Sequence, residues 1–322
     1  MSEIIDKLVA ASGLHHIAVR RILVSAPQRY KEFTIAKRNG GRRKIAQPAK
    51  ELKILQRAFA SEFLSDLPIH EAATAYRAGS SIRDNASKHA GFGPILKMDF
   101  KDFFPSISDR DWCEYCQKNK LFEDPQERRL STLLLFHRPK GGSKLRLAIG
   151  APSSPMLSNI LMFDFDKHIS ELVALDKVRY TRYADDLTFS APRTGHLTGV
   201  RKAVSKAINY VEFPNLKVNR EKTTYITTKY HRSVTGLTLA NDGRITIGRD
   251  KKREVRAAVH SFTLGKLDGE SIERLYGYIS FIHSVEPEFI DVLSKKYGVN
   301  AIQSLRDASA AIRQARDTDA YI

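Results

Sequence analysis

The sequence lacks long hydrophobic runs and an obvious secretion signal. No stretch of its 322 residues approaches the roughly 20 consecutive apolar residues that span a membrane. The first residues, MSEIIDKLVAASGLHH, carry two early acids and no long apolar segment. Internal repeats and low-complexity linkers are also missing. These absences argue against membrane-spanning and repeat proteins, and we expect a soluble, cytoplasmic protein with no membrane partner.

Cysteine is scarce. The 2 cysteines, Cys113 and Cys116, form one C-x-x-C pair, which supplies only half of a tetrahedral zinc site. We therefore predict reduced structural thiols, with redox or shared-metal chemistry as the alternative.

Acidic residues are too few to balance the basic ones. The 53 lysines and arginines exceed the 36 aspartates and glutamates, which gives a formal net charge of +17. Such a surplus favours a polyanion as partner, and nucleic acid is the leading candidate. Because 42% of the residues are hydrophobic, which is ordinary for a globular chain with a core, disorder is not expected.

Patterns of apolar residues and turn residues predict a mixed α and β fold. The segment YKEFTIAKRNGGRRKIAQP indicates two strands around Asn39-Gly40-Gly41, with basic residues at the tip that either clamp phosphates or are solvated. Apolar spacing predicts a buried-face helix from Pro155 to about residue 172. The other expected elements are helices up to residue 28, after Pro48 and over 199–212, a strand at 95–100, a hairpin over 177–192, short strands at 223–228, 234–239 and 244–248, and basic helices from Arg249 onward.

Two adjacent carboxylates indicate the chemistry. Asp185 and Asp186 lie in the turn of the hairpin predicted at 177–192, where Asn-Gly or Asp-Gly would be preferred and like charges repel. A pair of divalent cations would neutralise them, and nucleotidyl transfer uses such a pair. Asp99 ends another apolar strand and would supply a third ligand. Oxygen ligands suit Mg²⁺, so we expect two Mg²⁺ ions, with Mn²⁺ as the alternative.

Four segments, in order and spacing, resemble the reverse transcriptase family over about residues 30–240. They are MDFKDFFPSI at 98–107, IGAPSSPMLSN at 149–159, YADD at 183–186 and NREKTT at 219–224. The resemblance implies an RNA-directed DNA polymerase with an α+β right-hand fold, in which fingers, a palm of antiparallel strands backed by helices, and a helical thumb follow one another. We accordingly assign 1–95 to N-terminal helices and fingers, 96–240 to the palm with an inserted fingers segment at about 107–148, and 241–322 to a basic, RNA-binding thumb.

The resemblance also implies roles for single residues. Asp99, Asp185 and Asp186 would hold the metals with the backbone carbonyl of Phe100, and Tyr183 would lie beside the primer end. Phe104 would lie under the incoming sugar and exclude a 2′-hydroxyl, unless it is a core aromatic residue. The residues expected to contact the deoxynucleoside triphosphate are Arg42, Arg43, Lys44, Phe104 and Gly150.

Three further points concern this site. Ile149 stands where the family usually has glutamine, which puts a side-chain amide contact to the nucleotide in doubt but leaves the backbone role of Gly150. Lys222 would protonate the departing pyrophosphate, or else is an ordinary surface lysine. We interpret the remaining acids of these segments as caps or solvated carboxylates; they are Asp102, Asp109, Asp164 and Asp166.

Two short motifs resemble those of one branch, the retron reverse transcriptases. They are NAxxH, with Asn85 and His89, and VTG, which comprises Val234, Thr235 and Gly236. Asn85 and His89 would also be an ordinary i,i+4 pair on a helix. The resemblance implies that these residues contact RNA, and we add the thumb residues Lys251, Lys252, Arg253 and Arg256 as further RNA contacts.

Retron resemblance implies a particular biology. The partner would be a structured non-coding RNA encoded beside the enzyme, copied from the 2′-hydroxyl of an internal guanosine into branched multicopy single-stranded DNA (msDNA). Such enzymes serve in antiviral defence, usually with a separate effector protein. The alternatives are a group II intron-like or diversity-generating reverse transcriptase, and a non-catalytic RNA-binding scaffold of a defence complex.

Overall fold

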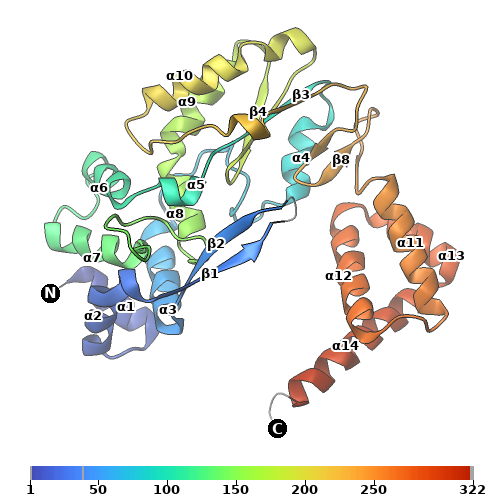
Figure 1. The fold of residues 1–322 in the computed structure, drawn as a ribbon, viewed down its shortest axis with the longest axis horizontal. Helices are drawn as coiled ribbons and strands as arrows, with labels where there is room; N and C mark the ends of the chain where they lie inside the picture. The colour runs from blue at the N-terminus through green and yellow to red at the C-terminus, as the bar shows by residue number, and fades with distance from the viewer. Residues whose placement is uncertain (1, 38–39, 320–322) are drawn as a thin grey trace. The chain divides into compact units, whose positions relative to one another are not determined.

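The computed structural model describes residues 2–37 and 40–319, which fold into two compact units (Figure 1). Unit 1 comprises Met1–Ser81 and Gly93–Thr227, and unit 2 comprises Ile82–Phe92 and Thr228–Ile322. Arg38 and Asn39 of the predicted hairpin turn lie outside the described residues. Within the described part of the chain, no helix has both the length and the apolar character needed to cross a bilayer.

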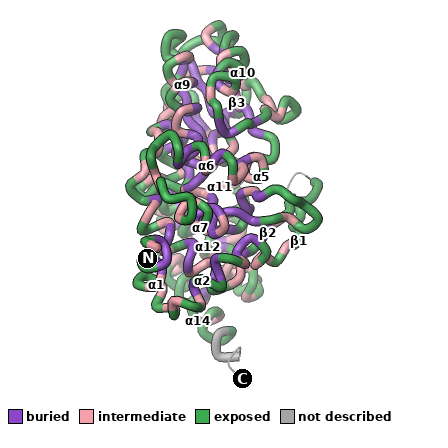
Figure 2. The backbone as a smooth tube through the Cα atoms, turned by 90° about the vertical axis from the view of Figure 1, so that its left-hand side faces the viewer, coloured by how far each residue is buried: buried purple, intermediate pink, exposed green. Residues whose placement is uncertain are grey.

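Unit 1 contains a four-stranded antiparallel sheet with the strand order β4-β5-β3-β6. Apolar side chains bury β3 and β5 on both sides, and Figure 2 shows β3 among the buried segments. Helix α9 packs against β4, and α10 packs on α9. The bounds are β3 Ile95–Asp99, α8 Ser154–Leu161, α9 Phe163–Ala174, β4 Arg179–Tyr183, β5 Asp186–Ser190, η3 Thr194–Leu197, α10 Val200–Tyr210, η4 Arg220–Lys222 and β6 Thr224–Ile226.

The N-terminal part of unit 1 holds a two-stranded hairpin and a set of helices. The two strands pair antiparallel from Tyr30 opposite Pro48 to Ala36 opposite Arg42, as predicted. Local signals fix the helix ends: the Ser2 hydroxyl caps α1, and Ser108 and Asp111 form a capping box at α6. The bounds are α1 Glu3–Ser12, α2 His16–Ser25, η1 Ala26–Gln28, β1 Tyr30–Ala36, β2 Arg42–Pro48, α3 Lys50–Phe59, η2 Ala60–Leu64, α5 Phe103–Ser106, α6 Asp109–Lys118 and α7 Pro125–Leu135.

Unit 2 is mainly helical, and the helices predicted from Arg249 onward are present. A small sheet with the order β7-β8-β9 packs against α4, and four helices follow it. The bounds are α4 Ile82–Ala90, β7 Ser233–Val234, β8 Leu237–Leu239, β9 Ile245–Thr246, α11 Arg249–Thr263, α12 Gly269–Val285, α13 Pro287–Tyr297 and α14 Val299–Asp319.

Two elements that were predicted to be continuous are each divided in the structure. The single helix expected from Pro155 to 172 is two helices, because Met162 takes φ −89° and ψ 2° and breaks the helical path. The single strand expected at 234–239 is a hairpin, because Thr235 and Gly236 both adopt positive φ and form its turn. The division into fingers, palm and thumb at residues 95 and 240 stays a prediction. No local pattern indicated that α4 belongs to unit 2, where it packs against the small sheet.

Candidate active site

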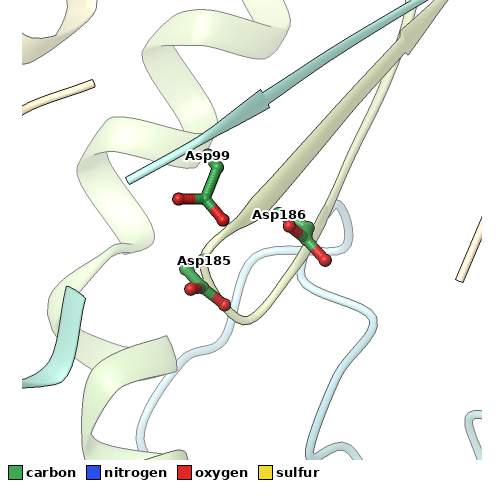
Figure 3. A group of neighbouring side chains, drawn as sticks. All are labelled: Asp99, Asp185 and Asp186. Atoms are coloured by element: carbon green, nitrogen blue, oxygen red, sulfur yellow. The ribbon is translucent and has the colours of Figure 1, made fainter. Parts of the chain in front are cut away.

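The register of the unit 1 sheet brings the three predicted acids together. Asp99, the last residue of β3, lies directly opposite Asp186, the first residue of β5, so both side chains lie on one face of the sheet. Asp185 precedes Asp186 in the tight turn between β4 and β5. One oxygen of each carboxylate lies within 4.8 Å of the others, and Figure 3 shows the three groups gathered at this edge.

The turn that carries the acids is strained. Ala184 takes φ +58°, in the left-handed region that costs a residue with a Cβ on the order of 1 kcal/mol or more. The backbone of β3 braces the turn from the other side, since the Phe100 amide donates to the Asp185 carbonyl at 3.1 Å. The predicted metal contact of the Phe100 carbonyl stays a prediction, as does the primer contact of half-buried Tyr183.

The electrostatics of the three acids are unfavourable as they stand. Asp186 is the most exposed of them, yet the protein atoms around it still desolvate it, and repulsion from Asp185 and Asp99 adds to that effect. Together these causes raise the pKa of Asp186 to about 6. Burial and the charge of Asp99 likewise raise the pKa of Asp185. Nearby positive charge would relieve all three groups.

The two carboxylate oxygens of Asp99 differ in their hydrogen bonding. Its Oδ2 accepts a hydrogen bond from Lys222 Nζ at 2.8 Å. Its Oδ1 is buried without a hydrogen-bond partner among the described residues. An orphaned buried acceptor beside two further carboxylates fits a hard divalent cation such as Mg²⁺, which prefers oxygen ligands.

Phe104 lies beside a second aromatic residue, Tyr76, which was not among the predicted site residues. The Phe104 ring is half-buried, and its centroid lies 6.4 Å from that of Tyr76. Tyr76 adopts φ +58° and is 48% exposed. Burial, followed by the negative charge of Asp185, raises the pKa of Tyr76, which places its hydroxyl in the field of the acids. The sequence signal for Tyr76 is weak: one aromatic residue in a segment rich in alanine, EAATAYRAGS.

The three basic residues of β2, which were predicted to contact the nucleotide, are exposed but differ in their partners. Lys44 is paired with Glu32 at 2.7 Å. Burial is the main cause that raises the pKa values of Asp185 and Tyr76, and the charge of Arg43 opposes that rise at both groups, so Arg43 acts on the acidic site. Arg42 is exposed at the start of β2. Contact of Arg42, Arg43 and Lys44 with a nucleotide stays a prediction.

Gly150 lies where β2 meets the segment before α8. The Ala46 amide donates to the Ile149 carbonyl at 2.9 Å, which joins the two segments. Gly150 takes φ +122°, and a Cβ there would lie 3.0 Å from the Ala46 carbonyl oxygen. The close approach that requires glycine in this structure is thus that of the β1–β2 hairpin, and contact of Gly150 with a nucleotide stays a prediction.

The two retron-like motifs lie together in unit 2. Asn85 and His89 are fully buried on one side of α4, which packs against the small sheet. Val234 is also fully buried, whereas Gly236 is exposed in the turn and Thr235 donates through Oγ1 to the Ile82 carbonyl at 3.0 Å. The motifs therefore stabilise a contact between α4 and the hairpin, and their contact with RNA stays a prediction.

The basic residues predicted at the start of the thumb are on α11 and are partly neutralised within unit 2. Lys251 pairs with Glu254 at 2.7 Å, and Arg253 with Asp250 at 2.5 Å. Lys252 pairs with Glu286. Arg256 lies over the Phe289 ring at 5.0 Å. Exposed Arg253 and half-buried Lys251 still present charge to solvent, and RNA binding by these residues stays a prediction.

One of the acids interpreted as a cap or a solvated carboxylate is neither. Asp166 is fully buried and accepts hydrogen bonds from Arg182, at 2.9 Å and 3.1 Å from Nε and at 2.6 Å from Nη2. The prediction for Asp166 is wrong because its partner lies on another element, β4. Asp164 on the same helix is partly exposed and pairs with Lys118 at 2.8 Å.

The cysteines are free thiols. Cys116 is buried and Cys113 is partly buried, which agrees with the predicted reduced structural pair. Burial, followed by the charge of Cys113, raises the pKa of the Cys116 thiol, so it is not activated as a nucleophile.

Comparison with known proteins gives concordant matches. The profile of the family described as reverse transcriptase (RNA-dependent DNA polymerase) matches residues 35–253. The retron Ec83 reverse transcriptase of Escherichia coli is 36% identical over 282 residues, covering 87% of this chain and 90% of the relative. The retron Mx162 reverse transcriptase of Myxococcus xanthus is 35% identical, covering 87% of this chain and 62% of that protein.

Among solved structures, apo telomerase from Candida tropicalis is similar with a TM-score of 0.50. It shares 14% sequence identity, and the match covers 88% of this chain and 58% of the telomerase chain. That likeness concerns the fold alone and agrees with the predicted right-hand polymerase architecture.

Proposed function

Because this chain belongs to the reverse transcriptase family, and within it to the retron enzymes, we propose that it copies a cognate structured RNA from an RNA 2′-hydroxyl into branched single-stranded DNA. RNA-directed DNA polymerase activity follows from family membership. The convergence of Asp99, Asp185 and Asp186 carries the proposal, since a divalent metal would pair the buried oxygen of Asp99 and relieve the repulsion among the three carboxylates.

The residues around the three aspartates have different roles in the proposed reaction. Asp99, Asp185 and Asp186 hold the metals, which when bound activate the attacking hydroxyl and stabilise the leaving pyrophosphate. Arg43 binds the triphosphate of the incoming deoxynucleotide. Lys222, whose hydrogen bond to Asp99 raises its pKa, stays protonated and donates a proton to the pyrophosphate.

Selection of deoxynucleotides rests on Phe104. Its half-buried ring lies beside Tyr76 at the edge of the acidic site, where a 2′-hydroxyl on the incoming sugar would meet it. This arrangement supports synthesis of DNA rather than RNA.

The basic residues of the chain are proposed to recognise the RNA. The net charge of +17 favours phosphate contacts, and neutralising even ~6 phosphates makes binding fall steeply with salt. Structured RNA is recognised mainly through shape and 2′-hydroxyl contacts. The msDNA product would then act in antiviral defence together with a separate effector protein.

The test is synthesis in cells that also transcribe the RNA encoded beside the reading frame. We expect a branched product that a debranching enzyme cleaves, and no product from Asp185→Asn with Asp186→Asn, although that variant still binds the RNA. A linear product would overturn the 2′-linked priming. DNA synthesis by the double variant would overturn the assignment of the active site.

A further inference from the structure

A buried polar network lies directly behind the acidic turn. Its centre is the guanidinium of Arg182 on β4, which is 0% exposed. Asp166 on α9 binds this group through both carboxylate oxygens and also accepts a hydrogen bond from Tyr180 Oη at 2.8 Å. A buried ion pair is weak evidence for stability, because apolar residues of similar size often stabilise a core equally well. The arrangement of the remaining donors suggests what the pair does.

Arg182 uses Nη1 to reach the catalytic turn and a second segment. One hydrogen bond goes to the carbonyl of Ala184, at 3.1 Å, and so holds the residue whose positive φ shapes the turn. Another goes to Asn159 Oδ1, also at 3.1 Å. The planar guanidinium fixes the angle between these two contacts, which a lysine ammonium would not do.

Asn159 links Arg182 to the segment that carries Tyr76. Its Nδ2 donates to the Ala75 carbonyl at 2.8 Å. The backbone of Arg182 binds the same segment, donating to the Ala72 carbonyl at 2.7 Å and accepting from the Thr74 amide at 2.9 Å. The segment just before Tyr76 is therefore hydrogen-bonded both to the backbone of β4, the strand that leads to Asp185 and Asp186, and to the side chain of Asn159.

The same group also supports Phe104. The Arg182 guanidinium lies over the Phe103 ring at 6.0 Å, and the Phe103 and Phe104 rings meet edge to face at 5.3 Å. One buried side chain thus contacts the turn that holds the acids, contacts Phe103 next to Phe104, and is linked through Asn159 to Ala75 next to Tyr76.

Resting on the function proposed above, we propose that Arg182, oriented by Asp166 and extended by Asn159, is a positioning residue that fixes the distance between the acidic turn and the Tyr76–Phe104 wall. This distance determines how the triphosphate and the sugar of one nucleotide are placed together. Loss of the network misplaces the wall relative to the metals, and misplacement of about 1 Å can cost on the order of 10²-fold in rate.

Two variants test the network without leaving a buried charge. Asn159→Ala keeps the Asp166–Arg182 pair and removes the link to Ala75. The triple variant Arg182→Met, Asp166→Leu and Tyr180→Phe replaces the pair and its partner hydroxyl by apolar groups, a change that buried ion pairs often tolerate without loss of folding. Asp164→Asn, which removes the exposed pair with Lys118 on the same helix, is the matched control.

The readouts are kcat and KM for a deoxynucleotide on a primed RNA template, and the ratio of deoxynucleotide to ribonucleotide incorporation. For Asn159→Ala we expect KM to rise about tenfold and the incorporation ratio to fall, with kcat less affected. For the triple variant we expect kcat/KM to fall on the order of 10 to 10²-fold. Asp164→Asn should match the wild type. A merely structural role would lower the folded fraction without changing KM or the incorporation ratio.

Two results would overturn the proposal, and only the second would also overturn the proposed function. Wild-type KM and incorporation ratio in folded Asn159→Ala, with wild-type kcat/KM in the triple variant, would refute the positioning role and leave the proposed function intact. DNA synthesis by Asp185→Asn with Asp186→Asn would refute both, because the turn that Arg182 holds would then not be catalytic.

Discussion

The buried carboxylate of Asp166 and the three carboxylates of the acidic site, all in unit 1, differ in how their charge is balanced. Asp166 is fully buried and is matched by Arg182 and Tyr180. Asp99, Asp185 and Asp186 repel one another, and Asp99 retains a buried oxygen without a partner in the described chain. A folded protein tolerates the second arrangement when a cation completes it. Charge balance therefore separates Asp166, for which we propose a positioning role, from the three acids for which we propose metal binding.

The largest contrast should appear in stability. Asp166→Ala leaves the Arg182 charge buried and unpaired, so we expect a loss of about 3–5 kcal/mol in the free energy of unfolding. Asp186→Ala removes a repelled acid whose pKa is raised to about 6, so at neutral pH and without divalent metal we expect a small gain in that free energy and no loss. Urea denaturation of both variants measures the difference. Equal losses would show that the two groups do not differ in charge balance.

Phe104→Ala probes the nucleotide side of the comparison. Removing the ring opens space for a 2′-hydroxyl, so the preference for deoxynucleotides should fall by roughly tenfold or more. Competitive incorporation of the two nucleotide types measures it. An unchanged ratio would reassign Phe104 to the hydrophobic core.

Gly150→Ala should act through the β1–β2 hairpin. The added Cβ would lie 3.0 Å from the Ala46 carbonyl at a positive φ, so the hairpin that carries Arg43 must shift. We expect a several-fold rise in KM for the deoxynucleotide and a loss of about 1 kcal/mol in stability. Gly195→Ala, where a Cβ meets nothing within 4 Å, is the control. Equal effects of the two substitutions would contradict the close approach.

The smallest expected effect is a pH dependence of stability. The pKa of Asp186 is raised to about 6, so the folded protein binds this proton more tightly than the unfolded chain does. The stabilisation is complete below the ordinary aspartate pKa and is lost as pH rises through about 6. Without divalent metal, the melting temperature should fall less between pH 5 and 7 in Asp186→Asn than in the wild type. An equal fall would exclude Asp186 as its source.

The acids of the site could be predicted from the sequence, whereas their supports could not. Asp99 and Asp186 end and begin apolar strands, so local patterns place them at one sheet edge. The pairing of Asp166 with Arg182 depends on how α9 packs on β4, and no local pattern encodes that packing. The break at Met162, which separates the helices that carry Asn159 and Asp166, interrupts an apolar pattern that continues through it. Tyr76 reaches the site only through the tertiary contacts of its segment.

Metal binding tests the account most directly. Mn²⁺ can be counted by electron paramagnetic resonance on the protein with a chain-terminated primer, an RNA template and the next deoxynucleotide. We expect two tightly bound Mn²⁺ ions per wild-type protein, and their loss in Asp185→Asn with Asp186→Asn, whereas Asp164→Asn retains both. Undiminished Mn²⁺ binding by the double variant would contradict the claim that these unbalanced acids are the metal site.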